Sequence, residues 1–106
     1  RSVPACLKNA VDVGSRPYGE NVWQGKPAAV ASMSPGTIGG FGAHHHLRQS
    51  LVAVGMPTLP QPEVYLGQVD RMLDAAGAFV DARQRDFAAG FMNAFAAWVE
   101  QHAARR

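Results

Sequence analysis

Two short apolar runs constrain the fold of this chain more than any other feature. The first, Ala28 to Met33, reads AAVASM, and the second, Glu63 to Leu66, reads EVYL and is closed by Gly67. Runs without polar alternation are typical of strands covered on both faces, as in parallel sheets. Helical patterns precede, separate and follow them. The order helix, strand, helix, strand, helix therefore predicts an α/β fold with a parallel sheet.

Three helices are expected around these strands. Ser2 can cap the first, which holds Pro4 in its first turn and stops at Gly14. The second follows a glycine-rich turn and runs to about Val54. Its apolar face is formed by Ala43, Leu47, Leu51 and Val54. The last helix carries an aromatic stripe that should pack in the core, made of Phe87, Phe91, Phe95 and Trp98.

A sheet of only two strands has two open edges and is marginal by itself. We therefore expect further strands to complete it, supplied by an N-terminal segment or by a partner chain. The sequence opens on Arg1 instead of Met, directly before a helical pattern. This favours a processed, trimmed or partial chain, and a short missing leader is the alternative.

Composition argues against several classes of protein. Apolar residues make up 47% of the chain and charged residues 17%, which is typical of a folded domain. The net charge is only +2, and no basic stripe with interleaved aromatics favours a nucleic-acid partner. No apolar run approaches the roughly 20 residues that a membrane span needs. The single cysteine, Cys6, is expected in the core and is consistent with a cytoplasmic location.

The strongest candidate for a ligand site is the glycine-rich turn from Ser32 to Gly40. It joins the carboxyl end of a strand to the start of a helix, the edge where open α/β sheets bind ligands. Its glycines let the backbone approach a flat ligand, and free N–H groups at a helix start favour anions or ring carbonyls. A tight turn without a ligand explains these residues equally well.

A dinucleotide fingerprint is a weaker interpretation of the same turn. Gly36, Gly39 and Gly42 spell G-x-x-G-x-x-G, and Glu63 follows at about the separation of a ribose-binding acid. Glu63 lies at the start of the next strand, however, whereas the fingerprint places its acid at the carboxyl end.

Three consecutive histidines, His44 to His46, invite a metal site. Successive helical residues point about 100° apart, so their rings cannot converge on one ion. We therefore expect no metal ligands, and place these histidines on the helix surface or at an interface. No nucleophile elbow or convincing carboxylate pair occurs, so no catalytic residue is assigned. Asp12 and Arg16, spaced i, i+4, are expected to pair on the surface.

Five motifs follow one another along the chain. They are Ser2 to Asp12 for S-x-P-G-x-L-K-N-A-x-D, Gly25 to Pro27 for G-K-P, Ser34 to Gly40 for S-P-G-x-x-G-G, His46 to Gln49 for H-L-R-Q, and Pro62 to Tyr65 for P-E-V/F. In this order they resemble the NADPH-dependent FMN reductases, a family that includes chromate and quinone reductases. Ala5 departs from the usual glycine after the proline, and Gly42 replaces a residue that is often larger or basic.

The resemblance implies a flavodoxin-like, three-layer parallel sheet, of which residues 1–106 would be the C-terminal part of one domain. It implies hydride transfer from NADPH or NADH to FMN and then to an acceptor such as a quinone or metal oxyanion. The family's phosphate-binding loop and P-E-Y-N motif have no counterpart here. The alternative function is therefore a non-catalytic half-domain that only assembles with partner subunits.

The resemblance also implies site residues and partners. Ser34, Pro35 and Gly36 would edge the flavin ring, with Ser32 and Gly39 as weaker candidates and Ser2 and Pro4 bordering the missing ring-binding loop. The family forms homodimers and homotetramers. We expect His45 and Glu63 at or near a subunit interface, and solvent exposure of both is the alternative.

Overall fold

The computed structural model describes residues 1–103 and has the expected order of elements. They are α1 (Ala5–Gly14), β1 (Ala31–Met33), α2 (Phe41–Ala53), β2 (Val64–Leu66), a 3₁₀ turn (Val69–Arg71) and α3 (Ala82–Ala103). The α/β class predicted from the apolar runs is confirmed. Within residues 1–103, no helix is long and apolar enough to cross a membrane.

The two strands form a parallel pair, with Ala31 opposite Val64 and Met33 opposite Leu66. β1 is shorter than the expected run, because only its last three residues join the ladder. Ala28, at the start of that run, forms a separate parallel bridge with Thr58. The two segments therefore stay together well before the strands begin, and both strands end at the same edge.

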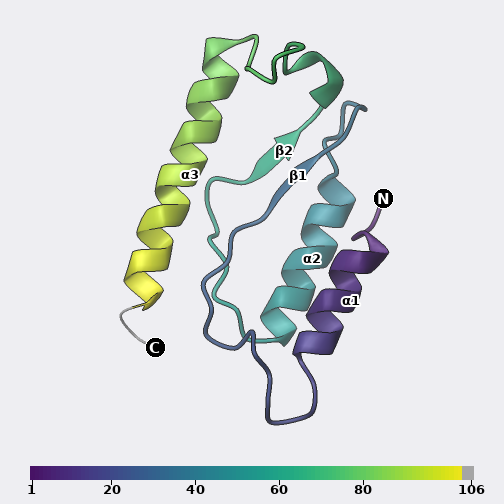
Figure 1. Ribbon diagram of the computed structural model, residues 1–106, viewed down its shortest axis with the longest axis vertical. Coiled ribbons are helices and arrows are strands. Elements are labelled where there is room, and N and C mark those ends of the chain that lie inside the picture. Colours follow the sequence, from purple (N-terminus) through teal and green to yellow (C-terminus); the bar gives the residue numbers. More distant parts are fainter. Residues whose placement is uncertain (104–106) are drawn as a thin grey trace.

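The elements are arranged in layers. Figure 1 shows α1 and α2 side by side on one flank of the strands and α3 on the other flank. α2 contacts both β1 and α1. A core of Val11, Ala28, Val30 and Leu51 fills the space between these elements. Within the described part of the chain, no third strand pairs with either of the two in the sheet.

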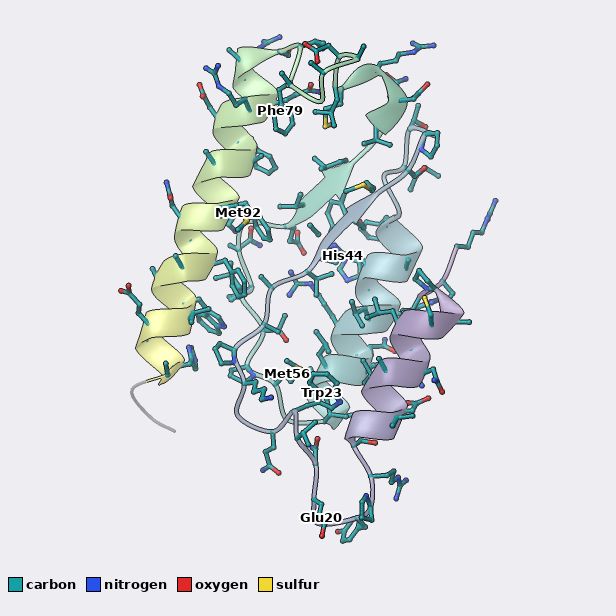
Figure 2. All side chains as sticks on the ribbon, viewed as in Figure 1. Glu20, Trp23, His44, Met56, Phe79 and Met92 are labelled. Carbon is teal, nitrogen blue, oxygen red and sulfur yellow. The ribbon has the colours of Figure 1, made fainter. Side chains whose placement is uncertain are left out.

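Trp23 closes one end of this core (Figure 2). Its indole N–H donates to the carbonyl of Val11 at 3.0 Å. A Cβ at Gly14 would lie 2.4 Å from the indole nitrogen, so the end of α1 needs glycine for the ring to pack there. Trp23 therefore anchors the loop that carries it, whereas the neighbouring Val22 is 52% exposed.

Two expectations for the first helix are wrong. Pro4, not Ser2, occupies the N-cap position of α1, and the cap has no side-chain hydrogen bond. The hydroxyl of Ser2 instead lies 3.0 Å from Nδ1 of His46, so a tertiary contact replaces the local cap. Cys6 is exposed because it faces away from the core side of α1 that Val11 marks.

The aromatic stripe of α3 does not lie in the core as expected. No residue of α3 is buried, and Phe87 is 44% exposed. Trp98 ties the helix to the body, since its indole N–H donates to the carbonyl of Pro57 at 2.9 Å. A sheet of two short strands is too narrow to cover a helix of 22 residues, which leaves the stripe half-covered.

Leu51→Ala should lower the free energy of unfolding by about 2–5 kcal/mol, because it leaves a cavity in the small core. Leu51 is 6% exposed, whereas its neighbour Val52 on the same helix is 72% exposed. Val52→Ala is therefore a matched control and should cost less than about 0.5 kcal/mol. Urea denaturation of the protein containing this chain measures both. Equal effects of the two changes would contradict the assigned core.

Candidate functional site

A groove of about 950 Å³ lies between α1, β1 and α2. Its walls bring together residues from three parts of the chain that are distant in sequence. Five of the seven predicted cofactor-binding residues line it, namely Ser2, Pro4, Ser32, Ser34 and Gly36. Most of the residues predicted from the sequence therefore lie around one cavity, at the carboxyl end of β1.

The other two predicted residues, Pro35 and Gly39, do not line the groove. Pro35 is exposed on the turn, and Gly39 is buried. Gly39 has φ +68°, and a Cβ there would lie 2.8 Å from the carbonyl carbon of Tyr65. Its own carbonyl accepts a hydrogen bond from the Ser32 hydroxyl at 2.7 Å. Gly39 therefore shapes the turn from behind and holds Ser32.

Hydrogen bonds attach the turn to the end of β2. The Ser34 N–H donates to the carbonyl of Leu66 at 3.0 Å, and the Gln68 N–H donates to the carbonyl of Gly36 at 2.8 Å. Within the turn, the Ser34 hydroxyl oxygen accepts from the Gly36 N–H at 2.9 Å. The hydroxyl proton of Ser34 remains available to a ligand, on a backbone that is already fixed.

Apolar side chains line the groove beside these hydroxyl groups. Met33 is 60% exposed, Ile38 74% and Phe41 50%, which is unusual for large apolar residues. Most ligand pockets combine such apolar walls with a few placed polar groups. The groove thus offers an apolar wall beside a polar edge.

Helix α2 holds the segment before α1 against the groove. The Ser2 hydroxyl lies 3.0 Å from His46 Nδ1, and a Cβ at Gly42 would lie 2.8 Å from the carbonyl oxygen of Arg1. Glycine at position 42 thus permits this close approach of backbone to helix. Sequence reasoning missed both contacts, although the unusual glycine at position 42 was a signal.

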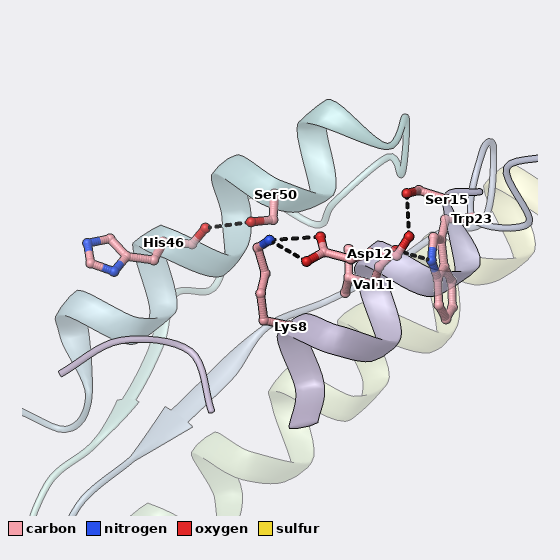
Figure 3. A network of polar contacts seen from close by, with 7 residues as sticks. All are labelled: Lys8, Val11, Asp12, Ser15, Trp23, His46 and Ser50. Atoms are coloured by element: carbon pink, nitrogen blue, oxygen red, sulfur yellow. Dashed lines mark hydrogen bonds and ion pairs between the residues drawn. The ribbon is translucent and has the colours of Figure 1, made fainter. Parts of the chain in front are cut away.

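A second cavity of about 550 Å³ lies between α1, the loop after it and the end of α2. Figure 3 shows that several of its polar side chains already have partners. Lys8 pairs with Asp12 at 2.7 Å, and Ser50 donates to the carbonyl of His46 at 3.3 Å. The expected pair of Asp12 with Arg16 is wrong, because Arg16 lies beyond the end of α1 while Lys8 lies one turn back. This cavity is the weaker candidate site.

Comparison with known proteins bears on the function of the larger groove. Residues 1–71 match the family model described as NADPH-dependent FMN reductase. The chain belongs to the NADPH-dependent FMN reductase family. A quinone reductase from Pseudomonas putida is 55% identical over 100 residues, covering 94% of this chain and 53% of the relative. A 2-hydroxy-1,4-benzoquinone reductase from Burkholderia sp is 41% identical over 99 residues, covering 93% and 54%.

A solved structure shares the fold of this reductase-family chain. It is FerB, a flavoenzyme NAD(P)H:(acceptor) oxidoreductase from Paracoccus denitrificans, with a TM-score of 0.87 and 42% identity. The match covers 95% of this chain and 56% of that one. The flavodoxin-like fold expected from the motifs is confirmed. The chain spans about half the length of the relatives it matches.

The three histidines of this family member contact three different segments. His44 Nδ1 lies 3.5 Å from the Ser32 hydroxyl, His45 Nε2 lies 2.8 Å from the Tyr65 hydroxyl, and His46 bonds to Ser2. The rings of His44 and His45 lie 5.2 Å apart, centroid to centroid, and both pack against the ring of Tyr65, whereas His46 turns to Ser2. The expected surface or interface position is wrong for His44, which is 1% exposed because its face of α2 packs on the strands.

The environment of His44 disfavours its protonated form. Its Nε2 accepts a hydrogen bond from Arg48 Nε at 2.8 Å. Burial, and next the positive charge of Arg48, lower the pKa of His44 from its ordinary value of 6.5. Arg48 also donates from Nη1 to the carbonyl of Leu59 at 3.1 Å, while its buried Nη2 has no hydrogen-bond partner among the described residues.

We expect the free energy of unfolding to decrease as the pH falls below about 6.5. Just below pH 6.5 the unfolded chain protonates His44 more readily than the folded chain, because the folded pKa is lower. The unfolded state therefore binds more protons, and acid favours it. Urea midpoints at about pH 7.5 and about pH 5.5 measure the slope, which His44→Gln should reduce. His102 is a half-buried histidine on α3, and His102→Gln is the control, which should leave the slope unchanged. The same slope in wild type and His44→Gln would disprove the assignment.

Proposed function

We propose that this chain forms the flavin-edge part of an FMN-dependent oxidoreductase. In the proposed reaction, hydride passes from NADPH or NADH through FMN to an acceptor such as a quinone or metal oxyanion. The observation that carries the proposal is the convergence of Ser2, Ser32 and Ser34 on one groove at the carboxyl end of β1. The names of the relatives support the quinone class of acceptor.

Bound FMN would supply the redox chemistry, since it accepts a hydride and passes electrons on. The residues of the chain would bind and orient it. Ser34 offers a hydroxyl donor to the polar edge of a ring, and Gly36 leaves room for close backbone approach. Met33, Ile38 and Phe41 would exclude water from the ring face. No acid, base or nucleophile is required from this part of the molecule.

The proposed cofactor-binding residues divide into two groups. Ser2, Pro4, Ser32, Ser34 and Gly36 border the groove, and Pro35 and Gly39 shape the turn around it. We propose that residues 1–106 are the C-terminal part of one flavodoxin-like domain. Within the described residues one edge of β1 is unpaired, which supports this proposal, because an open edge is usually paired or covered in a native sheet. We also propose a cytoplasmic location, because NAD(P)H is found inside the cell.

The protein containing this chain should bind FMN, lose the flavin absorbance anaerobically with NADPH, and regain it on addition of benzoquinone. Gly36→Val should weaken FMN binding by about tenfold or more, equivalent to about 1.4 kcal/mol. A Cβ at Gly36 would lie 3.3 Å from the Ser34 hydroxyl oxygen and crowd the loop. Flavin fluorescence titration measures the affinity.

Gly90→Val is the matched control, because a Cβ at Gly90 on α3 meets nothing within 4 Å. It should leave the FMN affinity unchanged. Failure of the wild type to bind FMN would refute the function. Unchanged FMN affinity in a well-folded Gly36→Val variant would remove this turn from the site.

We also propose that the protein is a homodimer or homotetramer with His45 and Glu63 at or near a subunit interface. His45 is half-buried and bonds to Tyr65, and Glu63 is exposed two residues before Tyr65 on the same strand segment. Partial burial, and then the Glu63 carboxylate, raise the pKa of Tyr65. These side chains form a polar cluster that a second copy can contact.

Both His45→Ala and Glu63→Ala should shift the assembly toward smaller species, because each removes one member of this cluster. Sedimentation velocity over a range of protein concentrations measures the change. His102→Ala, on the other flank of the sheet, should leave the assembly as it is. A wild-type monomer, or an oligomer that tolerates both substitutions, would end this proposal.

A further inference from the structure

His44 is the one described residue with a large side chain that is fully buried. Figure 2 places it between α2 and the strands. Buried polar groups need hydrogen-bond partners, and both of its ring nitrogens have neighbours. Arg48 Nε lies 2.8 Å from Nε2, and the Ser32 hydroxyl oxygen lies 3.5 Å from Nδ1.

The direction of these contacts follows from their chemistry. A guanidinium N–H can only donate, so Nε2 of His44 accepts and the ring proton sits on Nδ1. That proton faces both the Ser32 hydroxyl oxygen, at 3.5 Å, and the carbonyl of Val64 on β2. The Ser32 hydroxyl has a single proton, and it donates to the carbonyl of Gly39 at 2.7 Å. One directed series of contacts therefore runs from Arg48 to the glycine turn.

Gly39, the last residue of this series, helps to set the shape of the turn. Gly39 and Gly40 both have left-handed φ angles, +68° and +74°, and a Cβ at Gly40 would lie 3.1 Å from the Ser32 Cβ. A change in the Ser32 rotamer would break the bond from its hydroxyl to the Gly39 carbonyl and so release this pair. His44 borders the groove but is only 1% exposed, so its main effect on a ligand is transmitted through Ser32 and the turn.

We propose that His44 is a positioning residue for the groove. Arg48 sets its tautomer, and His44 in turn holds Ser32 in the orientation that fixes Gly39 and the turn. The identity of the ligand as flavin rests on the proposed function, whereas the control of the turn by His44 does not. Through the turn, His44 sets the affinity of the groove for the flavin ring.

A double-mutant cycle on FMN affinity tests the coupling, using the full-length protein that contains this chain. His44→Leu and Ser32→Ala should each weaken FMN binding about tenfold, which corresponds to about 1.4 kcal/mol. The double variant should lose no more than the weaker-binding single variant, because both changes break one series of contacts. Losses that multiply to about a hundredfold would show independent action and overturn the proposal.

Rescue separates positioning from a merely structural role. His44→Gln can still accept from Arg48 through its amide oxygen and donate to Ser32 through its amide nitrogen, so it should retain FMN affinity within about threefold. His102→Leu is the matched control and should change nothing at the groove. A Gln variant as weak as Leu, or a loss of thermal stability with unchanged FMN affinity, would overturn the proposal.

Hydrogen exchange gives a readout that does not need flavin. The amides of Ser34 and Gln68 are hydrogen-bonded across the turn and should exchange faster in His44→Leu. Ser32→Ala, which leaves His44 and Arg48 bonded, should have the same effect. If His44→Leu does not fold, the exchange rates in Ser32→Ala test whether this series of contacts fixes the turn. Unchanged exchange refutes the role of His44 even if FMN binds. Faster exchange in a protein that binds no FMN refutes the proposed function and leaves the role of His44 in the turn.

Discussion

The parallel pairing of β1 with β2 is the contact on which the groove depends. Parallel strands end at the same edge, so the turn that follows β1 can lie directly against the segment that follows β2. The bonds of Ser34 to Leu66 and of Gln68 to Gly36 use this proximity. An antiparallel pair would send the second segment away, and the glycine turn would then have no support from behind.

Helix α2 makes the second contribution, because it contacts every wall of the groove. Consecutive residues of a helix point about 100° apart, so three neighbouring histidines reach three different segments. His44 reaches β1, His45 reaches β2, and His46 reaches the approach to α1. The walls are therefore mechanically linked through one rigid element, although they are far apart in the sequence.

The order of elements and the position of the glycine turn could be predicted from the sequence, because both follow from local patterns. The burial of His44 could not, since a polar residue beside an apolar face is ordinarily exposed. Only its tertiary partners explain it, and the i, i+4 spacing from Arg48 was the one local signal. For the aromatic stripe of α3, the sequence predicts the apolar face but not its burial. Periodicity predicts which face of a helix is apolar, but the neighbouring layers decide whether that face is covered.

Gly42 has a consequence for the dimensions of the groove. At this position the backbone at Arg1 approaches α2 so closely that even a methyl group would not fit, since a Cβ would lie 2.8 Å from the carbonyl oxygen. Position 42 therefore acts as a spacer between the helix and the approach to α1. Any side chain there moves the approach outward and widens the mouth of the groove. A substitution at position 42 would therefore change the width of this mouth without touching the glycine turn.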